Sequence, residues 1–578
     1  MKALRHLNKY LLKYKWRLLL GIIFILISNI FAVYMPEIID SAIDKMSSID
    51  NTNFDNESFT RIGIYLCLLY LFFAFMKGIF LFFTRQTIIV MSRLIEYDLK
   101  NEIFNKYQKL NSSFYKDNKT GDLMNRISED VSKVRMYLGP AIMYTINVSI
   151  LFILVITFML NKNIELSIYV LSPLPLLSFI IYKISSVINR KSELTQIQQS
   201  KLSSYVQESF SGIRILKSYV REKYFQNEFK KETENYKQAS LNLAYVNSLF
   251  IPAIVLLIGL STIITIYIGG IKTINKEIDY GDIVQFIFYI NMLTWPIASV
   301  GWLTSLVQRA AASQKRINEF LENKQTIDFS AVESISEIRN LDMKNVCFSY
   351  NKEIEVLKGM SFSLKKGDTL GIIGKTGTGK TTIASLICKI YDINNGSILI
   401  NNKEIDIYNI SILRSKIAYV PQDVFLFSDT IYNNIAFGKI GATKEQVINA
   451  AKLACIYNDI MGFTDRFDTK IGERGVNLSG GQKQRISIAR ALIRKSEILI
   501  LDDCLSAVDT LTENIILNNI YNNSDDKITI IISHRINAIL KADNIIVIDE
   551  GTIAQQGSHT ELIQKQGQYA LLNKKQAN

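Results

Sequence analysis

The stretch GKTGTGKT at residues 374–381 decides how the second half of this 578-residue chain folds. The pattern G-x-x-x-x-G-K-T predicts a loop between a strand and a helix, in which glycines let backbone N–H groups close on phosphate oxygens. Lys380 is placed to reach the β- and γ-phosphates, and Thr381 to hold Mg²⁺. The following helix directs its positive N-terminal end at the same anions. The loop therefore predicts an α/β domain that binds a nucleotide.

Two further motifs follow the phosphate loop. Residues 478–482 read LSGGQ, and residues 498–503 read ILILDD, an apolar strand that ends in two carboxylates. Asp502, at the end of that strand, has the position from which a carboxylate coordinates Mg²⁺. The three motifs together resemble those of the ABC transporter family, and the resemblance extends over residues 336–578.

The resemblance implies an ATP site with assigned residues. Tyr350 matches the aromatic residue that stacks on adenine, for which a π-face is suited. Gln422 matches the residue that contacts Mg²⁺ and the attacking water, and His534 the histidine that faces the γ-phosphate. Alternatively, Tyr350 is an ordinary aromatic residue of a strand, and Gln422 and His534 have only structural roles. The implied catalytic residues are Asp503, His534 and Gln422; the implied magnesium ligands are Thr381, Gln422 and Asp502; and ATP would be held by Tyr350, Gly374, Lys375, Thr376, Gly377, Thr378, Gly379, Lys380, Thr381 and Thr382.

The LSGGQ motif implies a second subunit. In the family, each ATP lies between the phosphate loop of one subunit and the LSGGQ of the other. Small residues at this motif let backbone N–H groups approach the γ-phosphate. The residues implied to serve the partner's ATP are Ser479, Gly480, Gly481 and Gln482.

Asp503 departs from the family pattern, which usually has a glutamate that orients or activates the hydrolytic water. Aspartate is one methylene shorter, and a misplacement of about 1 Å can cost on the order of a hundredfold in rate. In the family, sites with this substitution commonly bind ATP and hydrolyse it slowly. This feature is similar to one half of bacterial heterodimeric exporters. The alternative is a homodimer in which Asp503 is the working base.

The first half of the chain is predicted to lie in a membrane. Hydrophobic residues make up 48% of the chain and charged residues 21%. A spanning helix needs about 20 predominantly apolar residues. Apolar stretches near that length lie at 18–36, 62–76 (continuing to 83), 136–160, 166–182, 245–270 and 283–307. We therefore expect a multi-domain protein: an all-α transmembrane domain of six helices at 1–321, a linker at 322–335, and an α/β P-loop NTPase domain of the ABC type at 336–578.

Charge predicts the orientation of these spans. Lysine and arginine before the first span, and along residues 85–135 and 183–244, indicate that these segments are cytoplasmic. The acidic segment 37–60 is expected on the external side of the membrane. An even number of crossings returns the chain to the cytoplasm, where ATP is available to the second domain. We expect a multi-pass protein of the cell (plasma) membrane. Residues 4–16 are expected to form an amphipathic helix with Arg5, Lys9 and Lys13 towards lipid phosphates, or a solvated juxtamembrane helix.

Other features narrow the function. The net charge of +13 is explained by basic residues beside the spans, and no nucleic-acid-reading motif is present. The five cysteines are scattered and imply no disulfide or metal site. The polar span residues Asn29, Asn147, Gln285 and Asn291 are interpreted either as cargo contacts or as interhelical hydrogen bonds.

The sequence favours a half-size ABC exporter, an ATPase that pairs with a second half transporter and exports amphipathic or lipophilic molecules, as in multidrug efflux. Its cofactors would be ATP and Mg²⁺, and its partners a second half transporter, the bilayer and a small-molecule or lipid cargo, with no nucleic acid. The alternatives are a lipid flippase, a siderophore-type importer of the same fold, and an ATP-gated regulatory subunit.

Overall fold

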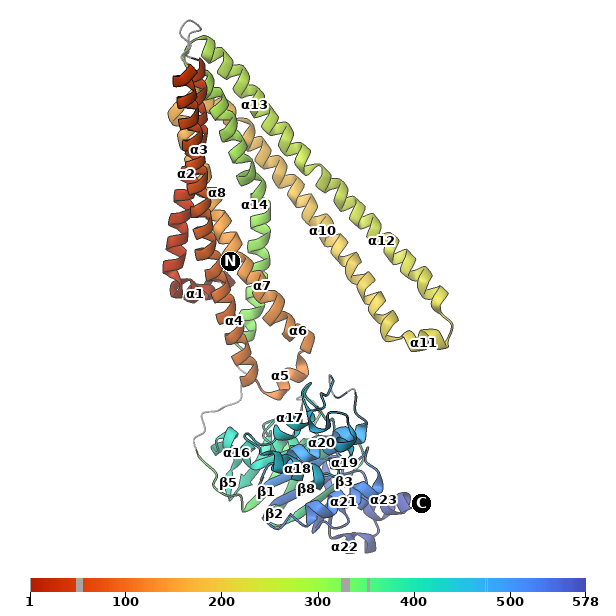
Figure 1. Cartoon of the computed structure of the whole chain (residues 1–578). Coiled ribbons are helices and arrows are strands. Elements are labelled where there is room, and N and C mark those ends of the chain that lie inside the picture. The colour runs from red at the N-terminus through yellow and green to blue at the C-terminus, as the bar shows by residue number, and fades with distance from the viewer. Residues whose placement is uncertain are drawn as a thin grey trace. The chain divides into compact units, whose positions relative to one another are not determined.

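The computed structural model describes residues 2–47, 56–323, 333–350, 354–472, 475 and 477–577. It divides into two compact units (Figure 1). One unit comprises Met1–Gln108 and Thr120–Asn323, and the other comprises Lys109–Lys119 and Lys324–Asn578. Most of the predicted linker 322–335 lies outside the described residues.

Among its described residues, the membrane unit has six helices, continuous or jointed, that are long and apolar enough to cross a membrane. Each predicted apolar stretch falls within one of them, which confirms the six-helix domain. Their bounds are Lys15–Lys45, Thr60–Lys109, Thr120–Lys162, Ile164–Ser211, Glu222–Ile274 and Tyr280–Leu321. The principal elements are α2 (Lys15–Ser47), α3 (Asn56–Thr84), α4 (Val90–Lys109), α8 (Ile142–Lys162), α10 (Pro173–Ser211), α12 (Glu222–Ser248), α13 (Phe250–Ile274) and α14 (Tyr280–Leu321).

The first helix is longer than the sequence predicts. We expected an acidic loop from residue 37, but α2 continues through Pro36 to Ser47. Neighbouring helices pair with two of its carboxylates: Lys162 Nζ lies 2.8 Å from Asp40 Oδ2, and the Gly281 backbone N–H donates to Asp44 Oδ1 at 2.9 Å. Because buried carboxylates are tolerated when they are paired, this acidic segment packs as helix.

The N-terminal segment also differs from the prediction. It forms a 3₁₀ turn (Lys2–Leu7) and α1 (Asn8–Lys13), with Leu4, Leu7 and Tyr10 buried. Lys9 Nζ pairs with Glu102 at 2.6 Å and Lys13 Nζ with Asp98 at 2.7 Å. These lysines therefore face carboxylates of α4 rather than lipid phosphates, a long-range pairing that local periodicity does not encode.

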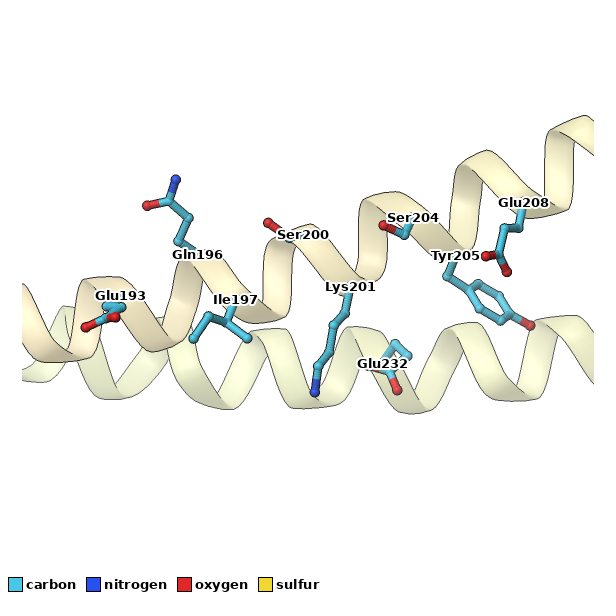
Figure 2. Close-up of a pocket in the computed structure, with 9 residues that line it drawn as sticks. All are labelled: Glu193, Gln196, Ile197, Ser200, Lys201, Ser204, Tyr205, Glu208 and Glu232. Atoms are coloured by element: carbon cyan, nitrogen blue, oxygen red, sulfur yellow. The ribbon is translucent and has the colours of Figure 1, made fainter. Parts of the chain in front are cut away.

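Helices α10 and α12 run side by side and are joined by α11 (Ile213–Ser218) (Figure 1). Within the described part of the chain, α12 has no buried residue. A groove of about 660 Å³ follows the pair, and Figure 2 shows Ile197, Lys201 and Tyr205 on the side of α10 that faces α12. The groove is lined by charged, hydroxyl and amide side chains together with Ile197. Over the described residues, this lining has neither the glycine-rich loop of a nucleotide site nor the apolar walls of a site for a lipophilic molecule.

The ATPase unit is built on two sheets. The larger has the order β10-β9-β3-β8-β7-β6, and every neighbouring pair from β9 to β6 is parallel. Its central strands are short, apolar and fully buried, as strands covered on both faces should be. Their bounds are β3 (Thr369–Gly374), β6 (Ile417–Val420), β7 (Ile498–Asp502), β8 (Ile528–Ile532), β9 (Asn544–Asp549) and β10 (Thr552–Gly557). The smaller, antiparallel sheet has the order β2-β1-β4-β5, with β1 (Asn340–Phe348), β2 (Leu357–Lys365), β4 (Asn395–Ile400) and β5 (Lys403–Glu404).

Candidate functional site

The predicted site residues follow the carboxyl ends of neighbouring parallel strands. The phosphate loop follows β3, Asp503 follows β7 and His534 follows β8. Backbone bonds extend the pairing past the strands, since the Asp503 N–H donates to the Ile532 carbonyl at 2.8 Å and the Ser533 N–H to the Ile372 carbonyl at 3.1 Å. Open α/β sheets bind ligands in the crevice outside this edge.

The phosphate loop leads from β3 into α15 (Lys380–Ile387), which is largely buried. Gly379 has φ +95°, and a Cβ there would lie 2.7 Å from Leu357 Cδ2, so glycine is required. Lys380 Nζ donates to the carbonyls of Gly374 at 2.8 Å and Lys375 at 2.6 Å. Burial lowers the pKa of Lys380. The ammonium thus sits inside the loop, where the oxygens of a phosphate chain would replace these carbonyls.

Two of the three proposed magnesium ligands, Thr381 and Asp502, meet at the start of α15. Thr381 Oγ1 lies 3.2 Å from Asp502 Oδ1, and Tyr419 donates from its hydroxyl to Asp502 Oδ2 at 3.1 Å. Asp502 is buried, and that burial raises its pKa. A hydroxyl and a carboxylate at this separation fit a hard cation such as Mg²⁺, which prefers oxygen ligands. An added positive charge would also favour the ionised form of this buried carboxylate.

The three residues proposed as catalytic lie around the same edge. Gln422 Nε2 donates to Asp503 Oδ2 at 3.5 Å, the long limit of a hydrogen bond. Asp503 has φ 45°, in the left-handed region that aspartate tolerates better than most residues. The loop bearing His534 is anchored because Gln576 Nε2 donates to the His534 carbonyl at 2.7 Å.

Tyr350 lies just after β1 and is tied to the phosphate-loop helix. Its hydroxyl is 3.0 Å from Thr382 Oγ1. The rings of Phe348 and Tyr391 meet the Tyr350 ring nearly at right angles, with centroids 4.9 and 5.2 Å away. Lys116 Nζ lies 3.9 Å from the centroid of the same ring.

The LSGGQ residues form the start of another helix, α20 (Gly480–Leu492). The Ser479 hydroxyl accepts from the Gln482 N–H at 3.3 Å, and Gln482 Oε1 accepts from the Ser479 N–H at 3.1 Å. A Cβ at Gly481 would lie 2.8 Å from the Ala507 carbonyl oxygen. Among the described residues, no hydrogen bond joins this motif to the phosphate loop. Ser479 and Gly480 are exposed at this helix start, and the N-terminus of a helix is a place where an anion can bind.

A second candidate site lies in the membrane unit and was missed from the sequence. A cavity of about 790 Å³ opens between α8, α10 and α14. Its described lining carries no charged side chain; the polar groups are Ser149, Ser178, Tyr182, Ser185, Ser186, Asn189, Thr304, Ser305 and Gln308. Single hydroxyls barely change the hydropathy of a span, so only the packing of the helices brings them together.

The polar span residues singled out from the sequence lie elsewhere. Asn29 Nδ2 donates to Asn147 Oδ1 at 3.0 Å, an interhelical bond. Gln285 donates to the Tyr289 hydroxyl at 3.0 Å, and Asn291 to the Ile287 carbonyl at 2.8 Å. None of these residues lines the cavity. The Asn29–Asn147 bond fits the interhelical interpretation, whereas the bonds of Gln285 and Asn291 lie within α14.

Comparison with known proteins agrees with both units. Residues 18–297 match the family model described as ABC transporter transmembrane region, and residues 357–506 match the model described as ABC transporter. The chain is 34% identical over 573 residues to the multidrug resistance-like ATP-binding protein MdlA of Buchnera aphidicola subsp. Baizongia pistaciae, covering 98% of each. It is 32% identical over 508 residues to an ATP-dependent lipid A-core flippase of Pseudomonas savastanoi pv. phaseolicola, covering 88% of this chain and 84% of the relative.

A solved structure of a bacterial Atm1-family ABC exporter with ATP bound is similar over 98% of both chains, with a TM-score of 0.80 at 26% identity. The six apolar helices and the ATP-binding α/β unit account for these matches. The chain belongs to the ABC transporters, as an exporter-type half transporter in which a multi-pass membrane domain is fused to an ATPase domain.

Proposed function

We propose that this chain is one half of a heterodimeric exporter in the plasma membrane, driven by ATP and acting on amphipathic or lipophilic molecules. One observation carries the proposal: the phosphate loop and the Thr381–Asp502 pair suit ATP and Mg²⁺, while the residue after Asp502 is the short Asp503. The proposed functional domains are 1–321 and 336–578, joined by a linker, with the N-terminus and the ATPase domain in the cytoplasm.

At the chain's own site, Lys380 would leave the Gly374 and Lys375 carbonyls and pair with the β- and γ-phosphates. Thr381 and Asp502 would hold Mg²⁺, with Gln422 completing the contact, and the bound cation would neutralise charge on the phosphates. Gln422 and Asp503 would orient the attacking water, and His534 would contact the γ-phosphate. The short Asp503 side chain makes this the slow site.

The LSGGQ helix would serve the other ATP. Ser479, Gly480, Gly481 and Gln482 would close on the γ-phosphate held by the partner's phosphate loop. The intact motif therefore supports the fast site on the partner, which should carry glutamate after its own strand-end aspartate. Closure of both sites would turn the membrane domains outward, and hydrolysis at the partner's site would reset them.

Turnover of purified protein in lipid tests the pairing. We expect the lone chain to hydrolyse ATP at least about tenfold more slowly than the chain co-expressed with a half transporter encoded beside it. A lone chain that forms dimers with the full rate would contradict the heterodimer and make Asp503 a working base. Omission of Mg²⁺, with a chelator present, is the zero-rate control for both preparations.

The cargo proposal rests on the cavity between α8, α10 and α14. An ion buried without a partner is costly, so a lining of hydroxyls, amides and apolar groups favours cargo without an exposed charge. A lipid is the second candidate, because a relative of similar length is named a lipid A-core flippase. Stimulation of ATP turnover by lipid alone, without response to drug-like amphipaths, would favour the flippase.

Replacement of Gly301 by leucine tests the cavity. A Cβ at Gly301 already meets Ser185 Oγ at 3.0 Å, so a larger side chain fills the space. We expect cargo-stimulated turnover to fall about tenfold while basal turnover stays near its original value. Gly259→Leu is the matched control, because a Cβ there meets nothing within 4 Å. Equal stimulation in Gly301→Leu and the original protein would show that cargo binds elsewhere.

A further inference from the structure

The short helix α5 (Ser112–Asp117) belongs to the ATPase unit, although it lies within the first half of the sequence. Its start is fixed because the Asn111 side chain accepts from the Phe114 N–H at 3.3 Å. Phe114 is 3% exposed, so the helix is anchored by a buried ring. Lys116 follows two residues later, in the last turn. Its ammonium lies over the Tyr350 ring, 3.9 Å from the centroid.

This contact uses a ring that is already oriented. The Tyr350 hydroxyl is tied to Thr382 at 3.0 Å, and Phe348 and Tyr391 meet the ring nearly perpendicularly. A cation within about 6 Å of an aromatic centroid is attracted by the negative face of the ring. Stacking of a purine and attraction of a cation both require the region directly above the π-system, so a purine stacked on the face that Lys116 covers would displace the ammonium.

We propose that Lys116 competes with the nucleotide base for the face of Tyr350. Lys116 therefore sets the affinity for adenine nucleotides, and arrival of the base releases the α5 lysine from the ring. The inference rests on the proposed role of Tyr350 as the adenine platform. It goes beyond that role by assigning a residue outside the ATPase motifs to nucleotide binding.

The competition has a definite sign and size. An exposed cation–π contact is worth about 0.5–1 kcal/mol, so removal of Lys116 should tighten binding about twofold to fivefold. Coupling between two interactions is reciprocal: if Lys116 weakens binding of the base to Tyr350, the bound base must weaken the Lys116–Tyr350 contact by the same factor. A ligand without a base should feel neither effect, since the phosphate loop and Tyr350 contact different parts of the nucleotide.

Calorimetry on the full-length protein, assembled with its partner in lipid nanodiscs, tests the proposal with two probes. ADP carries the base and is not hydrolysed, and inorganic pyrophosphate has no base. We expect Lys116→Met to bind ADP about twofold to fivefold more tightly than the original protein and pyrophosphate equally well. Lys116→Arg, which keeps a cation over the ring, should retain the original ADP affinity. Lys119→Met, on the same segment, is the matched control and should also be unchanged.

Two results would overturn the inference. Unchanged ADP affinity in Lys116→Met would mean that the lysine and the base do not compete, and weaker affinity would mean that Lys116 supports the base. Tyr350→Leu separates this from failure of the adenine platform: if it leaves ADP affinity unchanged, the platform role itself is wrong. If Tyr350→Leu weakens ADP binding, adding Lys116→Met to it should give no further tightening.

Discussion

Replacement of Lys380 by alanine is expected to weaken ATP binding at this chain's own site by about a hundredfold, the largest loss of affinity that we predict. Lys380 is buried and donates to two loop carbonyls, so it enters the site as a preorganised charge. Photolabelling with an azido-ATP, followed by separation of the two subunits, measures occupancy of each site. Label on this chain should disappear while label on the partner persists.

Ser479→Ala provides the contrast, because it should slow turnover at the partner's site and leave labelling of this chain intact. Ser479 also caps α20, and loss of a cap costs about 1 kcal/mol of stability. Ser479→Asn keeps a capping side chain and separates the two effects. Equal loss of turnover and of labelling in Lys380→Ala and Ser479→Ala would contradict the asymmetric scheme.

Asp503→Glu is expected to raise the turnover at this chain's site by up to about a hundredfold. The added methylene extends the carboxylate towards the water that Gln422 would orient; Gln422 Nε2 lies 3.5 Å from Asp503 Oδ2. The gain is opposed by the backbone, since Asp503 has φ 45° and glutamate is less suited to that region. To isolate this site, ATP turnover is measured with a partner whose own catalytic glutamate is replaced by glutamine.

Asp503→Asn is the control for charge, because it keeps the size of the side chain and removes the carboxylate. If Asp503→Asn abolishes turnover and Asp503→Glu leaves it unchanged, Asp503 is already a competent base. A melting temperature for each variant shows whether backbone strain, rather than chemistry, limits Asp503→Glu.

The sequence predicted the fold class because its signals are local. Six apolar stretches identify the spanning helices, and short apolar strands before the motifs identify the parallel sheet. Loop boundaries were less predictable: α2 passes Pro36 and Glu37 because Lys162 and Gly281, far along the chain, pair with its carboxylates. The N-terminal lysines likewise meet Glu102 and Asp98 through tertiary packing.

The proposed ATP site could be placed from the sequence because its motifs follow adjacent parallel strands, which must meet at one edge of the sheet. Residues that reach the site only through tertiary packing are not marked by any motif in the sequence. Tyr419 sits inside a strand and reaches Asp502 only once β6 pairs with β7. The contact of Lys116 with Tyr350 and the cavity lined by serines likewise depend on segments that packing brings together.

The assignment of Lys109–Lys119 to the ATPase unit bears on how such proteins can be recombined. A hybrid that takes residues 324–578 from one transporter and the rest from another would divide a single compact body between two parents. Phe114 and Lys116 would then meet a foreign surface. Exchanges that carry residues 109–119 along with the ATPase half should yield folded, nucleotide-responsive hybrids more often than exchanges made at the linker alone. The unit that must be exchanged as a whole therefore consists of two separate segments of the sequence, 109–119 and 324–578.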